Sequence, residues 1–552
     1  MISLKDWKDY YNNVAIAKKI EKDYLIKGES FDKYMPYFNN YFIGSIGYGL
    51  NAINEISLQI LAQALVNQLN NRNIKENYNI LLCHDGTSKD NVKFLDAMGH
   101  TFLAARMKVI KFANDEGITL PFLKHTLNKT KNIDIVFYIS KYTIDNKYTI
   151  ALFNREGKPF GTKILGTLAQ ACENINIHEI KEFIDVCARL DFAKLMNEYI
   201  ESIYKHNYLL SGNKLIKIAC IEDNLNHSFF KKIMGKNDFE YKIIKHNAKE
   251  EGAQFINIST RYLRELSNIK YLVKFSYDHK RVYFYSRIKS SILMPRFQLI
   301  DINLLIANFL VFTNNVICSN NKFTKITSVK STCATRSDLF NLLAKKYYLN
   351  YEETFTYTKQ DLTEPSFLYF NEKYDVITSW NQGFGQDAYL TFSMIVNMLN
   401  YYETQSMKLD DINAYNLSQL NHNLLSSFSI NCSLENLEPF ETKLFAQSEL
   451  NRLEISATED LRHINAEKER YIAKIYFEEN EWLVIKYSFE LKKLIFICQE
   501  TKTTKGEFAK KFKRFFTKFL KNYEHNFMFQ NEINDTGIND VKIDDNQTEQ
   551  NL

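Results

Sequence analysis

Short apolar runs alternate with amphipathic segments along most of this 552-residue chain, and the alternation restarts twice. The apolar runs have the length of strands, and the amphipathic segments have the period of helices. In the first stretch we expect helices over 53–69 and 91–105 and strands over 78–83, 108–112 and 134–139. This order is typical of βαβ units, which form mixed or parallel sheets with covered faces. We therefore expect tandem α/β domains.

The second stretch begins near Lys214, with an expected strand over 215–220 and an expected helix over 228–234. The third begins near Arg296, and for it we expect a helix to about Phe312, a strand over 325–330 and a helix over 337–347. No exact internal repeat accompanies this pattern, so the three units are comparable in plan only.

A different pattern follows. Residues 411–435 are rich in Asn and Ser and are expected to form a linker with some helix. Strands over 470–477, 481–487 and 493–499 and a helix over 506–523 then predict a smaller α+β unit. The predicted boundaries are 1–195 (domain I with an N-terminal helical extension), 196–293 (domain II), 294–410 (domain III), 411–435 (linker), 436–528 (domain IV) and 529–552 (a disordered acidic tail).

Composition narrows the classes of function. The 70 Lys and Arg nearly balance the 65 Asp and Glu, so the net charge of +5 gives no general argument for a nucleic-acid partner. The eight cysteines are scattered without the close pairs of a zinc or redox site, which favours buried thiols in a reducing compartment. The longest apolar stretch is too short for a transmembrane segment, and no signal peptide is evident. We expect a cytoplasmic protein.

Four segments invite a functional interpretation. Gly44–Gly49 could cradle a phosphate, although a simple glycine-rich turn is favoured. Ser140 follows an expected strand, where α/β sheets place ligands, but no neighbouring His activates it. Ser276–Arg281 holds one carboxylate, and one Asp is not a metal site. Residues 508–520 form a basic amphipathic helix, whose phenylalanine face is expected to pack in a core rather than on a membrane.

Taken in order, these segments resemble the loops of the α-D-phosphohexomutases, the family of phosphomannomutase and phosphoglucomutase, over about residues 41–521. Residues 47–54 resemble the family's glycine-rich amino-terminal segment, residues 82–85 its strand before an Asp-x-Arg loop, and 121–123 the tail of its Pro-Thr-Pro-x-Leu element. Residues 353–359, Glu-Thr-Phe-Thr-Tyr-Thr-Lys, match its Glu-Thr-Leu-Thr-Gly-Phe-Lys segment most closely.

The loops that would carry chemistry depart from the family pattern. The phosphoserine loop falls at 138–153, where Lys141 stands on the serine position and Ser140 lies one residue early. Ser276–Arg281 aligns with Asp-x-Asp-x-Asp-Arg, of which Asp278 and Arg281 match. Residues 379–385 stand where Gly-Phe-Glu-Glu-Ser-Tyr-Gly would bind sugar hydroxyls, with amides in place of both carboxylates. Residues 486–492 replace the Arg-Pro-Ser-Gly-Thr-Glu-Pro phosphate loop and keep only its serine.

The resemblance implies three tandem mixed-sheet α/β domains and a smaller C-terminal α+β domain around a central cleft. It also implies phosphoryl transfer on a hexose phosphate with Mg²⁺, or no cofactor if the chain is inactive. The candidate residues are Ser140 as phosphoryl carrier, Asp278 as metal ligand, and Lys359, Lys486 and Ser488 as substrate-binding groups. We expect a degenerate member with weak or no activity. The alternatives are a non-catalytic scaffold that binds a protein partner and an active mutase with displaced ligands.

Overall fold

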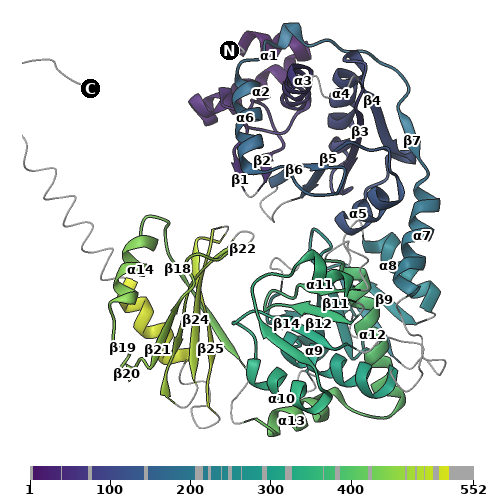
Figure 1. Ribbon diagram of the computed structural model, residues 1–552. Coiled ribbons are helices and arrows are strands. Elements are labelled where there is room, and N and C mark those ends of the chain that lie inside the picture. The colour runs from purple at the N-terminus through teal and green to yellow at the C-terminus, as the bar shows by residue number, and fades with distance from the viewer. Residues whose placement is uncertain are drawn as a thin grey trace, which may run out of the picture. The chain divides into compact units, whose positions relative to one another are not determined.

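The structure is a computed structural model (Figure 1). It describes residues 4–38, 40–72, 77–141, 147–205, 216–221, 226–237, 239–246, 252–262, 264–288, 295–317, 326–364, 366–379, 386–420, 425–466, 469–478, 481–489, 491–501 and 509–520. Two compact units make up the chain, residues 1–414 and 415–552. Each is described by itself.

The first unit begins with a helical extension and a seven-stranded sheet. The extension comprises α1 (Leu4–Tyr11), α2 (Val14–Lys27) and the short turn η1 (Gly28–Asp32). The sheet has the order β1-β2-β6-β5-β3-β4-β7. Its strands are β1 (Tyr37–Phe38), β2 (Tyr41–Ser45), β3 (Asn79–His84), β4 (Lys108–Phe112), β5 (Ile135–Lys141), β6 (Lys147–Asn154) and β7 (Ala188–Leu190).

Helices cover both faces of this sheet. Apolar side chains of α3 (Glu55–Arg72), α4 (Asp90–Ala104) and α6 (Thr162–Glu173) share one buried cluster with the strands, and the N-terminal extension joins it through Trp7, Ile20 and Phe31. Figure 1 shows α5 (Leu120–Lys129) on the opposite side from α3. The strands β5, β3, β4 and β7 run parallel, so their carboxyl ends meet at one edge of the sheet.

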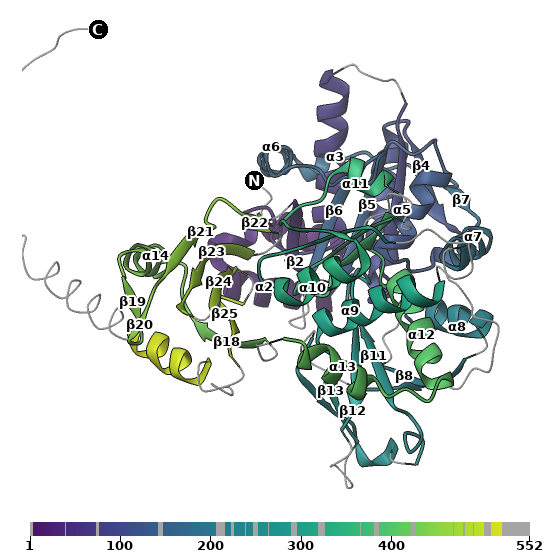
Figure 2. The ribbon, with the colours of Figure 1, turned by 60° about the horizontal axis from the view of Figure 1, so that its bottom comes forward.

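Two further sheets follow in the same unit (Figure 2). The six-stranded sheet has the order β10-β13-β12-β11-β8-β9 and the four-stranded sheet the order β15-β14-β16-β17. The strands of the six-stranded sheet are β8 (Lys217–Ile221), β9 (Glu240–Ile244), β10 (Phe255–Asn257), β11 (Tyr271–Phe275), β12 (Val282–Arg287) and β13 (Arg296–Leu299). Those of the four-stranded sheet are β14 (Ser328–Ser331), β15 (Asn350–Glu353), β16 (Phe367–Phe370) and β17 (Val376–Thr378). The helices around them are α7 (Phe192–Lys205), α8 (Asn226–Asn237), α9 (Ile302–Phe312), α10 (Ser337–Tyr347), α11 (Lys359–Thr363), α12 (Ala388–Thr404) and α13 (Leu409–Ser418).

The second unit is a sheet with helices on one face. Its order is β18-β25-β24-β23-β21, from β18 (Ser426–Asn431), β21 (Ala457–Asp460), β23 (Glu469–Tyr476), β24 (Trp482–Ser488) and β25 (Lys493–Gln499). The short strand β22 (Asn465–Ala466) pairs with β23, and β19 (Glu449–Leu450) and β20 (Leu453–Glu454) form a separate two-stranded sheet. Helix α14 (Leu437–Phe445) and a helix over 509–520 pack on the sheet through Phe440, Phe512 and Phe516. The predicted core role of the basic helix is confirmed, while Phe508 and the predicted acidic tail lie outside the described residues.

The predicted mixed α/β fold class is confirmed, with two local corrections. The helix expected from Arg296 begins only at Ile302, because residues 296–299 form β13 and pair with β10 and β12. The expected linker over 411–435 contains β18, whose Phe428 stacks on Phe496 of β25 with ring centroids 4.6 Å apart. The remaining domain boundaries stay a prediction.

A buried carboxylate at the start of α12 ties the first unit together. The Asp387 side chain accepts hydrogen bonds from the backbone N–H groups of Tyr389 and Leu390 at 2.9 and 3.2 Å, which caps the helix. Its second oxygen accepts a 2.8 Å bond from the hydroxyl of Tyr199 on α7. Burial raises the pKa of Asp387, so the three donors compensate for the cost of burying this carboxyl.

We expect Tyr199→Phe to lower the free energy of unfolding of the first unit by about 1–3 kcal/mol, because it removes a donor from a buried acceptor. Urea denaturation followed by fluorescence would measure the loss. The control Tyr348→Phe removes a hydroxyl from a side chain that is 90% exposed and should change little. Equal stability of the two variants would contradict this role for the Asp387 cap.

Candidate functional site

The glycine-rich segment is a closed turn between β2 and α3. The Asn54 amide donates to the carbonyl oxygens of Gly47, Gly49 and Ala52 at 3.0, 2.9 and 3.2 Å. Gly49 has a φ of +98°, and a Cβ there would lie 2.8 Å from the ring of Phe31. Glycine is thus required by backbone conformation and by close packing.

The carboxyl end of β3 carries a buried acid that binds its own neighbours. The Asp85 carboxylate accepts from the backbone N–H and the hydroxyl of Thr87 at 2.9 and 2.6 Å, and from the Lys141 backbone N–H at 2.6 Å. Burial raises its pKa, against these hydrogen bonds. The acid therefore joins the ends of β3 and β5 through hydrogen bonds within the protein.

Ser140 lies within β5, whereas the sequence analysis expected it in the loop after that strand. The strand continues to Lys141, and Ser140 pairs with Thr149 of β6. The two side-chain hydroxyls lie 2.9 Å apart. Residues 142–146, in the middle of the predicted phosphoserine loop over 138–153, lie outside the described residues, and residues 147–153 belong to β6.

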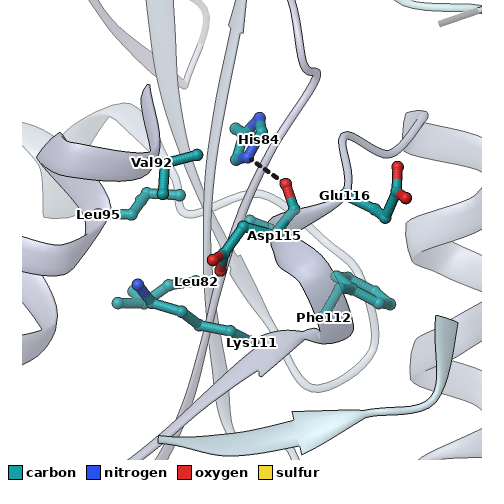
Figure 3. A pocket seen from close by; sticks show the side chains of 9 residues that line it. Leu82, His84, Val92, Leu95, Lys111, Phe112, Asp115 and Glu116 are labelled. Atoms are coloured by element: carbon teal, nitrogen blue, oxygen red, sulfur yellow. Dashed lines mark hydrogen bonds between the residues drawn. The ribbon is translucent and has the colours of Figure 1, made fainter. Parts of the chain in front are cut away.

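A small pocket opens beside the same sheet edge, at the ends of β3 and β4 (Figure 3). His84, Lys111, Asp115 and Glu116 supply its polar groups. The His84 Nδ1 accepts from the Gly86 N–H at 2.9 Å, so Nε2 carries the proton and donates to the Asp115 carbonyl at 3.2 Å. Burial lowers the pKa of His84. Both ring nitrogens of His84 are engaged, Lys111 pairs with Asp96, and Asp115 pairs with Arg189, so His84 is not available as a base in this pocket.

The predicted metal loop is the hairpin between β11 and β12. Ser276 donates from its hydroxyl to Asp278 at 2.6 Å, and the Lys280 backbone N–H donates to the same oxygen at 3.1 Å. The Lys280 ammonium lies 3.6 Å from the other carboxylate oxygen, with only 11% of the lysine side chain exposed. The Arg281 guanidinium forms two hydrogen bonds with Asp375, just before β17.

These groups keep Asp278 ionised. Desolvation acts to raise its pKa, but the charges of Lys280 and Arg281 and the hydrogen bond from Ser276 outweigh it and hold the pKa well below its usual range. The cation beside the carboxylate is thus a lysine of the same hairpin. Mg²⁺ requires several oxygen ligands, and the ammonium repels it, so this loop does not fit the family's metal. Among the described residues, no group of three or more His, Cys, Asp or Glu side chains could hold a metal ion.

The hairpin is fixed in position by α12. His279 has a φ of +54°, lies buried, and stacks on Tyr389 with ring centroids 5.6 Å apart. Its Nδ1 lies 3.0 Å from the Tyr389 hydroxyl, and its carbonyl accepts from the Ala388 N–H at 3.1 Å. The same helix start that Asp387 caps therefore positions this loop.

Three of the loops named from the sequence converge inside the first unit. The Lys141 ammonium lies 5.9 Å from the ring centre of Tyr277 at the hairpin tip. Tyr357, in the segment that resembles Glu-Thr-Leu-Thr-Gly-Phe-Lys, is near enough to Lys280 and Asp375 for their charges to act on its pKa, which burial raises. The side chain of Lys359 and residues 380–385 lie outside the described part.

The predicted phosphate-binding residues of the second unit are engaged with their own sheet. Lys486 lies on β24, where its ammonium is 2.9 Å from a carboxylate oxygen of Glu469 and its side chain is 4% exposed. Ser488 ends the strand, and its hydroxyl accepts from the Leu491 N–H at 3.3 Å. Phe489 packs against the hydrophobic core. Lys486 and Ser488 lie at the end of β24, and their polar groups are used within this unit.

Sequence analysis missed the residues that balance these charges. Asp375 pairs with Arg281 and Glu469 pairs with Lys486, and neither belongs to a family motif quoted above. Lys141 was noted only as the residue on the serine position, without its contact to Tyr277. Alternation along β23 and β24 could have placed Glu469 and Lys486 on one face, whereas nothing in the sequence links residues 281 and 375.

The chain was compared with known proteins. No protein-family model matches it, and no curated protein sequence does. A Thermus thermophilus protein assigned as a phosphomannomutase has a similar structure, with a TM-score of 0.60, 14% identity, and coverage of 88% of this chain and 99% of that chain. A phosphoglucomutase/phosphomannomutase family protein from Burkholderia thailandensis has a TM-score of 0.58 and 12% identity over 89% and 98% of the chains.

A third similar structure is the open form of the Paramecium exocytosis-sensitive phosphoprotein pp63/parafusin, a phosphoglucomutase. It has a TM-score of 0.52 and 12% identity, covering 80% of this chain and 86% of that chain. The likeness therefore extends across both units and confirms the resemblance that the loops suggested. This chain has the fold of the α-D-phosphohexomutases.

Proposed function

We propose that this chain is a degenerate phosphohexomutase with weak or no mutase activity. The observation that carries the proposal is the Lys280 ammonium, which pairs with Asp278 at 3.6 Å in the loop that would hold Mg²⁺. The cation beside Asp278 is therefore the side chain of Lys280, a residue of the hairpin itself. A divalent ion would have to displace this ammonium and then find oxygen ligands that Ser276 and Lys280 do not supply.

Phosphoryl transfer depends on positioning and on neutralising the charge of the transferred group. In the resembled enzymes, an enzyme phosphoserine would donate to a hexose phosphate with Mg²⁺ supplying that neutralisation. Here the Ser140 and Thr149 hydroxyls form a hydrogen bond with each other. The Asp85 carboxylate accepts hydrogen bonds from the Lys141 backbone N–H and from Thr87, and both ring nitrogens of His84 are hydrogen-bonded. If the chain is active, hexose phosphate is the expected substrate and Ser140 the expected carrier, with Lys359, Lys486 and Ser488 as binding groups.

The alternative is a non-catalytic scaffold that binds a protein partner. Helix 509–520 favours it, because Phe512, Phe516 and Phe519 are buried while its cations are all exposed: Lys510, Lys511, Lys513, Arg514 and Lys518. A cytoplasmic location is consistent with cysteines that are free and, at six of the seven described positions, buried. No helix within the described residues has the length and apolar character needed to span a bilayer.

We expect purified protein to show no turnover above background with glucose 1-phosphate or mannose 1-phosphate in the presence of Mg²⁺ and a hexose bisphosphate. A coupled spectrophotometric assay measures turnover, and intact mass measures any phosphoryl adduct. Turnover that disappears in Ser140→Ala would overturn the proposal and make the chain an enzyme with a rearranged loop. The absence of turnover and of an adduct would support it.

The double variant Ser276→Asp/Lys280→Asp should gain measurable Mg²⁺ affinity, because it removes the tethered cation and restores two oxygen ligands. Isothermal titration calorimetry, with the unmodified chain in parallel, measures the gain. A matched control is Lys217→Asp, which removes a lysine that pairs with Glu240 on the sheet surface. If the double variant folds but binds no more Mg²⁺ than this control, the alignment of the metal loop is wrong.

A further inference from the structure

The glycine-rich turn is covered by the N-terminal extension, which the family resemblance does not include. Two side chains near the end of α2 hold the Tyr48 backbone. The Asp23 carboxylate accepts from the Tyr48 N–H at 3.1 Å, and the Lys27 ammonium donates to the Tyr48 carbonyl at 2.6 Å. Phe31 lies against Gly49, within 3.0 Å of where a Cβ would stand.

The two charged side chains bind the turn more closely than they bind each other. Asp23 and Lys27 are four residues apart on α2, yet the ammonium and carboxylate lie 3.8 Å apart. Each instead makes a shorter bond to the Tyr48 backbone. An ordinary surface pair of this spacing contributes only a few tenths of a kcal/mol. This pair closes over a turn and is mostly shielded, with 30% and 24% of the two side chains exposed.

Partial burial of the Lys27 ammonium is unfavourable, and the Asp23 carboxylate offsets part of this cost. Desolvation lowers the pKa of Lys27, and the neighbouring carboxylate acts in the opposite direction. Gly47 allows the approach, because a Cβ there would lie 3.2 Å from the Asp23 Oδ2. A backbone N–H, an ammonium and a glycine that leaves room for an oxygen atom are the features of an anion site. Here the anion is a side chain of the same protein.

We propose that the Tyr48 N–H and the Lys27 ammonium form a latent oxyanion site, which the Asp23 carboxylate occupies. A ligand that takes this site must carry an oxyanion of about carboxylate or phosphate size, and it must displace Asp23. The N-terminal extension then serves as a built-in occupant that keeps the glycine-rich turn closed. This inference stands apart from the proposed loss of mutase activity, since it concerns residues 23, 27 and 48 alone.

The test is rescue of an emptied site by inorganic phosphate. Asp23→Ala should lower the melting temperature, and phosphate should restore part of that loss, because a ligand that binds only the folded state stabilises it. We expect phosphate to raise the melting temperature of the variant by about 1–2 °C more than that of the wild-type chain, compared with chloride at equal ionic strength. Subtracting the wild-type response removes the general salting effect of phosphate.

Two matched variants separate a site from a general loss of charge. Glu21→Ala removes a carboxylate of the same helix, which pairs with Lys8, and should show no phosphate-specific gain. Asp23→Ala/Lys27→Met lacks the ammonium, so the gain should disappear. If Asp23→Ala does not fold, Asp23→Ser opens the same space. An Asp23 variant that folds and responds to phosphate no more than wild type or Glu21→Ala would overturn the inference, whatever the mutase assay shows.

Discussion

The pairing of Lys280 with Asp278 neutralises the carboxylate in the hairpin between β11 and β12. A partly buried carboxylate needs a compensating positive charge. Here Lys280, two residues after Asp278, supplies it. With Asp278 satisfied, Arg281 is available to Asp375 and joins the hairpin of the six-stranded sheet to the four-stranded sheet. His279 and Tyr389 then fasten the hairpin to α12. This arrangement needs no ion from solution.

Charged side chains are also paired within the protein at other loops, which lie far apart in the sequence. Asp23 and Lys27 hold the backbone of the glycine-rich turn, and Glu469 neutralises Lys486 on the last sheet. Buried charges are tolerated in proteins only when they are paired and hydrogen-bonded. The charged side chains of these loops are therefore paired within the protein. Such pairing is compatible with a stable fold, and it is the basis on which we propose a degenerate mutase.

The sequence predicted the strands and helices well because their apolar periodicity is local. It failed at residues 296–299, where a strand of four residues runs into a longer apolar helix and leaves no break in the pattern. It failed again at 426–431, where Ser and Asn alternate with Phe428 and Ile430 on an edge strand that is half exposed. The loop chemistry was predicted only as departures from a family pattern. Pairs such as Arg281 with Asp375 join residues 94 positions apart, and only the fold brings them together.

Paired charges also constrain how such a protein could regain a ligand site. Replacing only Lys280 would leave Asp278 without its neighbouring ammonium, and replacing only Lys486 would remove the ammonium that lies 2.9 Å from Glu469. Removing one partner of a buried pair is unfavourable because the other charge is left uncompensated. Solvent reduces this cost at Asp278, whose side chain is 40% exposed. Recovery of a metal or phosphate site therefore requires coordinated changes, each unfavourable by itself. If the chain is degenerate, as we propose, the ion pairs within these loops also oppose the return of a ligand site.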